Sequence, residues 1–321
     1  GYIPFEELPY SYNPPQGYIA TANNAVVGSD YKYMITLDWD KGYRARRIVD
    51  MIEADKKAGK ITVAAIQKQQ GDNANLSAQE VLPFVANLTF TDPRLKSPQQ
   101  YLLKWNFQQN MESGEAALYN MFWSKLIINT FYDELPDTVW PEPSADTMMA
   151  MRYLLEQPNN KWWDDAKTKD RVETRDEILA KSFKDAYDEM VNRYTEDTKN
   201  WSWGKLHTAS FQNATLGKSG IAPIEWLFNR NNYQTAGGAS IVNATGYRIA
   251  KPSDKRTDAK TFEVTNVPSM RMIVDLAHLE KSVTIHTTGQ SGHAFNKHYN
   301  DMVDMWRTIQ YHPMLWDRGS V

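Results

Sequence analysis

Two histidines and an aspartate near the C-terminal end have side chains that can bind a metal or transfer protons. His293 and His298 lie five positions apart, and Asp301 follows three positions later. Such a set could hold a zinc-type ion that activates water, and a metallohydrolase of this kind would lose its activity to a chelator. A helix presents metal-binding histidines four positions apart, however, so hydrogen-bonded structural histidines are the favoured interpretation.

Two other segments match catalytic patterns only in part. The run Gly289-Gln-Ser-Gly292 is followed by His293, whereas the nucleophile elbow of serine hydrolases needs a glycine at that fifth position. The run therefore favours a tight turn between a strand and a helix. His207 stands between Trp203 and Phe211, which favours a histidine packed among aromatic rings.

The asparagine pair Asn23-Asn24 and the arginine Arg44 carry polar groups that suit catalysis. An asparagine amide fixed at the end of a strand can donate a hydrogen bond to the negative oxygen that develops during amide hydrolysis. Taken alone, an Asn-Asn pair is most often a turn, and an arginine at the start of a helix is most often solvated. The residues by themselves leave both interpretations open.

The elements that must position these residues follow a strand, helix, strand order. Residues 1–40 alternate aromatic residues with Pro and Gly, and Gly17–Ala22 is a short β-prone run, so strands and loops are expected there. From about 41 to 195, apolar residues recur three to four apart, which predicts helices. Beyond Trp201 the chain returns to β-prone runs, which favours one α+β domain whose sheet uses both ends of the chain. The expected helices cover 41–59, 113–132, 144–157 and 171–194, and the expected strands lie within 240–250, 261–267, 270–276 and 283–288.

Two further helix starts are predicted from capping patterns. Ser77 precedes Glu80 with the spacing of a capping box. Ser97 is followed by Pro98 and by Gln100, which combines an N-cap residue, a proline at the first helical position and a glutamine at the third. Helices are therefore expected to begin at these two serines.

The composition excludes several classes of protein. The 321 residues carry 36 Lys and Arg against 39 Asp and Glu, a net charge of −3, without a basic block for nucleic acid. No run of about 18 apolar residues occurs, so no membrane span is expected. Cysteine is absent, which excludes disulfides, cysteine-bound metals and a cysteine nucleophile. The 11 Trp, 17 Tyr and 11 Phe suit either a packed core or an apolar ligand pocket.

Several segments taken together carry a resemblance to a known family. In order along the chain they are NPPQGYIATANN, WSWGKLH, the GG of TAGGAS, VPSMRMIVDL, GQSG and HYNDMVDMW. The chain resembles the C-terminal part of the β-subunit of penicillin acylases, which are N-terminal-nucleophile amidases. This group also includes acyl-homoserine-lactone acylases and glutaryl-type acylases. The resemblance covers 1–321 and is strongest at 1–47 and 200–316.

The resemblance implies a fold and a chemistry. Members are made as one precursor, reach the periplasm or are secreted, and cut themselves into α and β chains. The serine that begins the β chain attacks an amide carbonyl, and its own α-amine accepts the proton. The implied fold is a four-layer αββα sandwich with a large helical insert. Residues 1–40 would hold sheet strands and the oxyanion loop, 41–200 the mainly helical insert, and 201–321 the returning strands and a C-terminal helix.

The resemblance also assigns residues. Asn23 corresponds to the asparagine of the oxyanion hole, and Arg44 to the arginine that holds the active-site hydrogen bonds in place. The spacing between them differs by one residue from the family pattern, so Arg46 or Arg47 is an alternative for the second role. No cofactor is required, but Asp30 matches a calcium-ligand aspartate whose companion ligands lie outside this chain, so a structural calcium ion is possible.

Gly1 has no side chain with which to attack a substrate, so the nucleophile is expected in another chain. The implied partners are the acylase α-chain and the N-terminal part of the β-chain, and the implied substrate is a small N-acyl amide. We expect one fragment of a further-nicked enzyme or a shortened chain. The alternative is a non-catalytic fragment, scaffold or binding subunit that retains the acylase fold.

Overall fold

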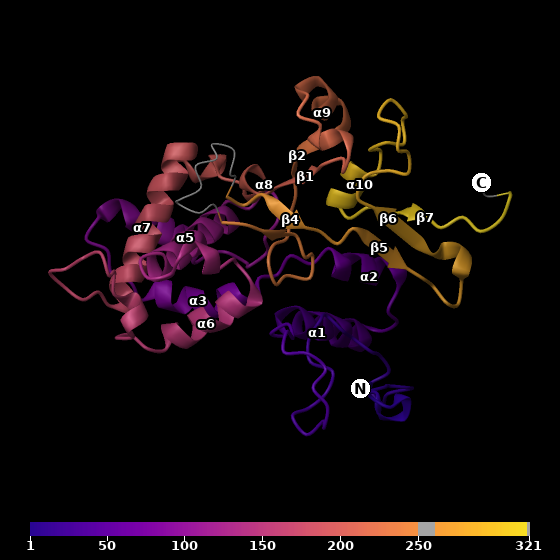
Figure 1. The fold of residues 1–321 in the computed structure, drawn as a ribbon, viewed down its shortest axis with the longest axis horizontal. Coiled ribbons are helices and arrows are strands. Elements are labelled where there is room, and N and C mark those ends of the chain that lie inside the picture. Colours follow the sequence, from indigo (N-terminus) through magenta and orange to yellow (C-terminus); the bar gives the residue numbers. More distant parts are fainter. Residues whose placement is uncertain (250–260, 320–321) are drawn as a thin grey trace.

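The computed structural model describes residues 1–249 and 261–319. Figure 1 shows a cluster of helices at one end of the molecule and a β-rich part at the other, with β1, β2 and β4 between them. The helices are α1 Tyr43–Ala58, α2 Val63–Gln70, α3 Leu76–Ala86, α4 Lys96–Leu102, α5 Gly114–Phe131, α6 Ala145–Leu155, α7 Arg175–Arg193, α8 Trp203–Leu206, α9 Ala222–Phe228 and α10 Val303–Arg307. The strands are β1 Thr208–Phe211, β2 Arg230–Gln234, β3 Gly246–Tyr247, β4 Val264–Asn266, β5 Met270–Ile273, β6 Val283–His286 and β7 His312–Pro313.

Helix α5 forms the centre of the helical cluster. It is apolar around most of its circumference, and a helix of that kind must be covered on every side. Helix α7 packs along it, and the ring of Phe183 lies 6.1 Å from that of Phe122. The side chain of Ser113 caps the start of α5 by accepting a hydrogen bond from the Ala116 N–H. The helices expected at 41–59, 113–132, 144–157 and 171–194 are therefore confirmed, with ends shifted by a few residues.

The two helix starts predicted from capping patterns are wrong in detail. Helix α3 is capped by Asn75, whose Oδ1 accepts from the Ala78 N–H at 2.9 Å, and Ser77 instead donates to that same oxygen. Asparagine is at least as good an N-cap as serine, so it takes the position. The second helix is preceded by a 3-10 turn over Pro93–Leu95, and Asp92 caps that turn, so Ser97 lies inside the helical segment.

The strands form small antiparallel sheets in the part of the chain that the structure describes. β1 pairs with β2, β3 pairs with β4, and β5, β6 and β7 form a three-stranded sheet. Each β-prone run expected beyond Trp201 contains a strand, although in 240–250 only Gly246–Tyr247 is paired and residue 250 lies outside the described residues. The mixed α+β class is confirmed, whereas a complete four-layer sandwich is not seen in these residues.

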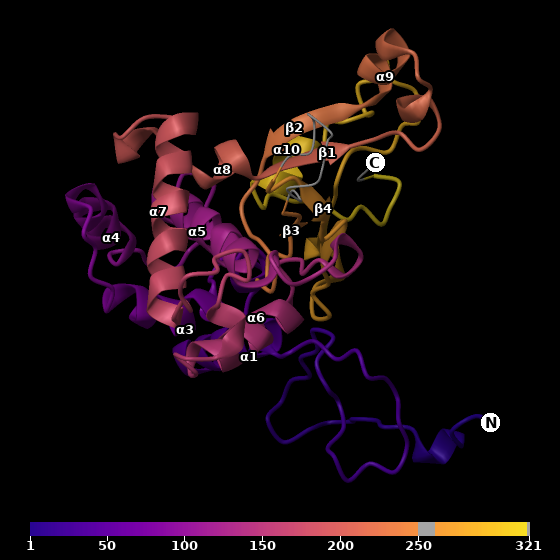
Figure 2. The ribbon, with the colours of Figure 1, turned by 60° about the vertical axis from the view of Figure 1, so that its left-hand side comes forward.

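The strands expected in residues 1–40 are absent. This segment contains a 3-10 turn at Phe5–Glu7 and one isolated parallel bridge between Asn24 and Asp40. Figures 1 and 2 both place it outside the helical cluster, beyond α1. A strand is stable only beside another strand, and none of the described strands pairs with Gly17–Ala22. The β-prone residues there remain a loop for that reason.

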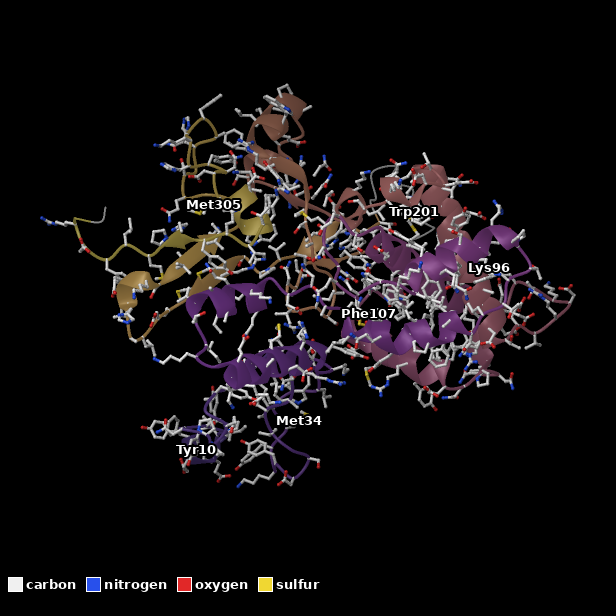
Figure 3. The ribbon with its side chains drawn as sticks, turned by 180° about the vertical axis from the view of Figure 1, so that it is seen from behind. Tyr10, Met34, Lys96, Phe107, Trp201 and Met305 are labelled. Atoms are coloured by element: carbon white, nitrogen blue, oxygen red, sulfur yellow. The ribbon has the colours of Figure 1, made fainter. Side chains whose placement is uncertain are left out.

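Many apolar side chains of this N-terminal segment face solvent. Tyr10 is 89% exposed and Met34 is 75% exposed, and Figure 3 shows both on the loops below α1.

The helices that the structure describes include none with both the length and the apolar character needed to cross a bilayer.

Candidate functional site

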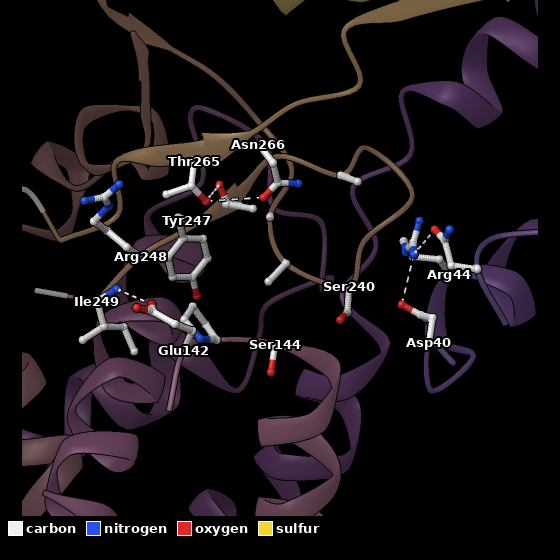
Figure 4. Close-up of a pocket in the computed structure, with 16 residues that line it drawn as sticks. Asp40, Arg44, Glu142, Ser144, Ser240, Tyr247, Arg248, Ile249, Thr265 and Asn266 are labelled. Carbon is white, nitrogen blue, oxygen red and sulfur yellow. Dashed lines mark hydrogen bonds and ion pairs between the residues drawn. The ribbon is translucent and has the colours of Figure 1, made fainter. Parts of the chain in front are cut away.

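A pocket of about 730 Å³ opens between three parts of the chain. One wall is built by Asn23, Asp40 and Arg44, and a second by the segment that leads into α6. The third wall consists of the loop 236–246, which we call the pocket loop, together with β3 and β4. Figure 4 shows Arg44 and Asp40 on one side of this pocket and Thr265 and Asn266 on another. Its lining residues are Asn23, Asp40, Arg44, Glu142, Pro143, Ser144, Gly238, Ala239, Ser240, Ala244, Gly246, Tyr247, Arg248, Ile249, Thr265 and Asn266.

Asn23 and Arg44 are in direct contact in this pocket. The guanidinium nitrogen Nη2 of Arg44 donates to Oδ1 of Asn23 at 2.9 Å and to Oδ2 of Asp40 at 3.0 Å. A guanidinium group has donors only, so the amide oxygen of Asn23 must face it. The amide NH₂ group then points away from Arg44, and no described residue accepts a side-chain hydrogen bond from it. This leaves an oriented neutral donor at the pocket wall.

The backbone fixes Asn23 as firmly as its side chain does. Its φ angle of 63° lies in the left-handed region, which asparagine tolerates better than most residues. Its carbonyl accepts a 2.8 Å hydrogen bond from the Asp40 N–H, and Asn24 forms the parallel bridge with Asp40. The Asn24 side chain accepts from the Ala22 N–H and so stabilises the turn. Of the pair, Asn23 presents its amide at the pocket and Asn24 shapes the backbone.

Asp40 is a site residue that the sequence analysis missed. Its Oδ1 accepts from the Gly42 N–H just before α1, while its Oδ2 holds Arg44. The signal was present in the sequence, because a carboxylate four residues before an arginine at a helix start is the spacing of an ion pair. Gly42 has a φ of 89°, a conformation that suits glycine and lets the chain turn sharply into α1.

The alternative arginines lie elsewhere. Arg47 makes two hydrogen bonds to the carboxylate of Asp72, at 2.8 and 2.7 Å. Arg46 is 74% exposed and lies 4.0 Å from Asp50. Neither lines the pocket, so the structure brings Arg44 and not these two to Asn23.

Asp30 lies on an exposed turn and does not line the pocket. Calcium takes six to eight oxygen ligands, several of them carboxylates. Within residues 1–249 and 261–319 no group of three or more His, Asp or Glu side chains is arranged to hold a metal ion. The residues around Asp30 therefore do not fit a calcium ion by themselves.

The C-terminal histidines do not come together as a metal-binding set in the described chain. His298 pairs with Asp301 through its Nδ1 at 2.7 Å, whereas the ring of His293 lies 5.8 Å from that of Phe295. The Ser291 N–H donates to the carbonyl of His298, so the glycine-flanked run folds as a turn after β6. The metallohydrolase interpretation gains no ligand set from this arrangement.

His207 is a structural histidine, as the aromatic sequence around it predicts. It is fully buried and stacks on Trp203 with ring centres 4.5 Å apart. Its Nδ1 bonds the Phe262 carbonyl and its Nε2 bonds the Thr245 hydroxyl, at 3.1 and 3.0 Å. Burial lowers the pKa of His207 to about 3, so the ring stays neutral. Burial likewise raises the pKa of the neighbouring Tyr247, whose hydroxyl donates to Asn120.

Comparison with known proteins places the whole chain in one group. The family model for penicillin amidase matches residues 1–321. The chain belongs to the penicillin amidase family. Relatives in this family include the acyl-homoserine lactone acylase QuiP of Pseudomonas fluorescens, which is 28% identical over 94% of this chain and 37% of its own length. The penicillin acylase 2 proenzyme of a Pseudomonas species is 26% identical over 99% of this chain and 39% of its own length.

A solved structure shares the fold over part of its length. The thermostable penicillin G acylase of Alcaligenes faecalis superposes with a TM-score of 0.54 at 15% sequence identity. The match covers 98% of this chain and 56% of that chain. The mixed α+β arrangement thus matches part of that acylase, and the chain spans well under half the length of the two curated relatives.

Proposed function

We propose that this chain is the C-terminal part of the β-subunit of an N-acyl amide hydrolase, to which it supplies the oxyanion donor Asn23. The observation that carries the proposal is the hydrogen bond from Arg44 to the amide oxygen of Asn23. It fixes the orientation of the amide of Asn23, a residue that lines the pocket, with the NH₂ group directed away from Arg44. Family membership supports an amide-hydrolysing chemistry, since the named relatives are acylases.

In the proposed reaction, the nucleophile is the N-terminal serine of a companion segment. Its hydroxyl attacks the carbonyl carbon of the amide, and its own α-amine accepts the proton. The carbonyl π electrons move to the oxygen, which becomes negative, and the Asn23 NH₂ donates to that oxygen. When the tetrahedral intermediate collapses, the C–N bond breaks and the amine leaves with the proton. Water then hydrolyses the acyl-enzyme to the free acid.

Arg44 has a supporting role in this scheme. Its charge persists across the whole working pH range, so the amide of Asn23 keeps one orientation. Asp40 accepts from the same Nη2 atom and thereby fixes the guanidinium. A donor already in place before the charge develops needs no reorganisation when the oxyanion forms.

The relatives suggest which amides to test. One is named an acyl-homoserine lactone acylase and another a penicillin acylase, and in both names the amine half of the amide is a small cyclic group. We propose an N-acyl amide of this kind as the substrate, and the two families of compound can be compared directly. The companion chains would be the acylase α-chain and the N-terminal part of the β-chain, in an assembled enzyme of the periplasm or the extracellular space. A calcium ion at Asp30 is part of the proposal only if companion segments bring further oxygen ligands.

The test is the assembled enzyme with Asn23→Asp, assayed on N-acyl-homoserine lactones and on penicillin G. Aspartate tolerates the left-handed backbone and can still accept from Arg44, but it has no NH₂ group. We expect kcat to fall by about 10² to 10³, the usual loss for one oxyanion donor. Asn192, an exposed asparagine on α7, provides the matched control Asn192→Asp. Equal turnover in the two variants would exclude Asn23 as the donor and would favour the scaffold or binding-subunit alternative.

A further inference from the structure

Arg47 and Asp72 form an ion pair beside the pocket but outside its lining. The two guanidinium hydrogen bonds to the carboxylate measure 2.8 and 2.7 Å, and the Asp72 side chain is only 9% exposed. A two-pronged pair of this kind fixes direction as well as distance. Arg47 lies about one turn after Arg44 on α1. The ion pair between Arg47 and Asp72 therefore also fixes the orientation of α1 about its axis and its position along that axis at Arg44.

Asp72 also binds the opposite wall of the pocket, through its backbone. Its backbone carbonyl accepts a 3.0 Å hydrogen bond from the Asn243 N–H, and Asn243 belongs to the pocket loop. Asn243 is 1% exposed, and its side chain is bonded on both sides. Its Nδ2 donates to Asn73 at 3.0 Å, and its Oδ1 accepts from Arg271 at 2.9 Å.

The guanidinium of Arg271 fixes the side chain of Asn243 by donating to its amide oxygen. Arg271 is 4% exposed, donates to the Trp306 carbonyl at 2.7 Å and lies over the Trp306 ring. Its Nε has no hydrogen-bond partner among the described residues. A buried cation with only neutral partners is costly, and the hydrogen bonds from Arg271 to Asn243 and to the Trp306 carbonyl offset part of that cost while they hold the Asn243 side chain in place.

The pocket loop then transmits the constraint to the cavity. The Asn243 carbonyl packs so closely on Gly237 that a Cβ there would lie 2.2 Å from its oxygen. Gly238 and Ser240 follow immediately and line the pocket, and Figure 4 shows Ser240 and Arg44 on separate segments at its border. From Arg44 through α1, Arg47, Asp72 and Asn243, an unbroken series of bonds therefore joins one pocket wall to the other.

We infer that Arg47 and Asp72 are positioning residues that set the separation between the wall bearing Asn23 and Arg44 and the pocket loop. The inference rests on the proposed function, because the separation matters only if a substrate is held between these walls. Neither residue touches the pocket, so its effect on the reaction must pass through α1 and Asn243. A misplacement of about 1 Å by a change remote from the chemistry can cost about a hundredfold in rate.

Arg46 offers a matched control on the same helix. It is adjacent in sequence, is largely exposed and makes only a 4.0 Å contact with Asp50. Exposed ion pairs of this kind contribute little to the free energy of folding. The experiment compares Arg47→Lys, Asp72→Asn and Arg46→Lys in the assembled enzyme. It measures kcat and KM separately, and it measures hydrogen exchange of the peptide covering 236–246 in the absence of substrate.

We expect Arg47→Lys and Asp72→Asn to lower kcat at least tenfold with a smaller change in KM, and to speed exchange at the Asn243 N–H. Arg46→Lys should match the parent enzyme in both measurements. Lysine keeps the charge but not the two-pronged geometry, so folding should survive. The inference is overturned if Arg47→Lys behaves like Arg46→Lys, or if kcat falls while exchange of the pocket loop is unchanged. Failure of the proposed function gives a different result, because Asn23→Asp would then retain full turnover while the exchange experiment still reports on the linkage.

Discussion

Arg44 holds Asn23 by its amide oxygen, through a single 2.9 Å hydrogen bond from Nη2. The same nitrogen also donates to Asp40, so one atom links the asparagine to a carboxylate. Because the guanidinium cannot accept, the contact assigns the oxygen and the nitrogen of the Asn23 side chain without ambiguity. The orientation of a neutral amide in this pocket therefore depends on a charged pair behind it.

Removing that carboxylate should reduce activity by loosening Arg44 and, with it, the amide of Asn23. We expect Asp40→Ala to lower kcat of the assembled enzyme by about tenfold to a hundredfold. The change removes the carboxylate that accepts hydrogen bonds from the Arg44 guanidinium and from the Gly42 N–H. Asp38→Ala is the control, because Asp38 is exposed and outside the pocket. Steady-state kinetics on the preferred amide would check this, and equal kcat for the two variants would contradict it.

Glycine at 237 should be far less replaceable than glycine at 220, although both have positive φ. Gly237, with φ of 90°, has no room for a Cβ, whereas Gly220, with φ of 75°, has nothing within 4 Å. We expect Gly237→Ala to lower the free energy of unfolding by about 3 kcal/mol, and Gly220→Ala by about 1 kcal/mol. Urea unfolding measures both. A similar loss for the two would mean that the contact with Asn243 is easily relieved.

The two candidate caps of α3 can be separated by mutation. Asn75→Ala removes the acceptor for Ala78 and leaves Gln109 without the donor that reaches it at 2.6 Å. We expect a cost of about 2 kcal/mol for this change and about 1 kcal/mol or less for Ser77→Ala. Chemical denaturation of both variants gives the comparison. The reverse order would restore Ser77 as the cap.

His207 should make the protein sensitive to acid. Burial lowers the pKa of His207 to about 3 in the folded state, below its ordinary value of 6.5. The unfolded chain therefore takes up the proton first, so this contribution is complete above about pH 6.5 and is lost as the pH falls toward 3. We expect a slope of about 1.4 kcal/mol per pH unit in that window.

The variant His207→Gln removes this titration and should flatten the dependence of unfolding free energy on pH between 3 and 6.5. His278→Gln is the control, because His278 is exposed and its ring lies 3.6 Å from the exposed carboxylate of Glu280. Unfolding curves at several pH values would decide. Parallel profiles for the parent and His207→Gln would show that other groups dominate acid unfolding.

Much of the helical part could be predicted from the sequence. The regular spacing of apolar residues marks α1, α6 and α7, because each of these helices buries one periodic face, and α5 is marked by a long and mainly apolar run. The buried role of His207 also follows from its aromatic neighbours. Local patterns suffice wherever the stabilising contact lies within one turn or between successive helices.

Other features depend on residues far apart in the chain. The β-prone run Gly17–Ala22 lacks a neighbouring strand, so its propensity is not realised. The link from Asp72 to Asn243 spans 171 positions and leaves no local mark, since each residue alone is an ordinary polar residue. Asp40 could have been predicted as a partner of Arg44, because the four-residue spacing between them is visible in the sequence. The roles of Asn23 and Arg44, by contrast, are predicted only through a resemblance, and their contact emerges only in the structure.

The enclosure of α5 limits where this chain can accept change during engineering. Its side chains, among them Trp123 and Phe122, are surrounded on every side, so a swap to another apolar residue of different volume meets neighbours that cannot yield. Helix α7, which packs along it, has an exposed outer face that carries Lys184, whose ammonium pairs with Asp188 of the same helix. Libraries aimed at activity should therefore leave α5 intact and place solubilising or immobilising substitutions on the outer face of α7.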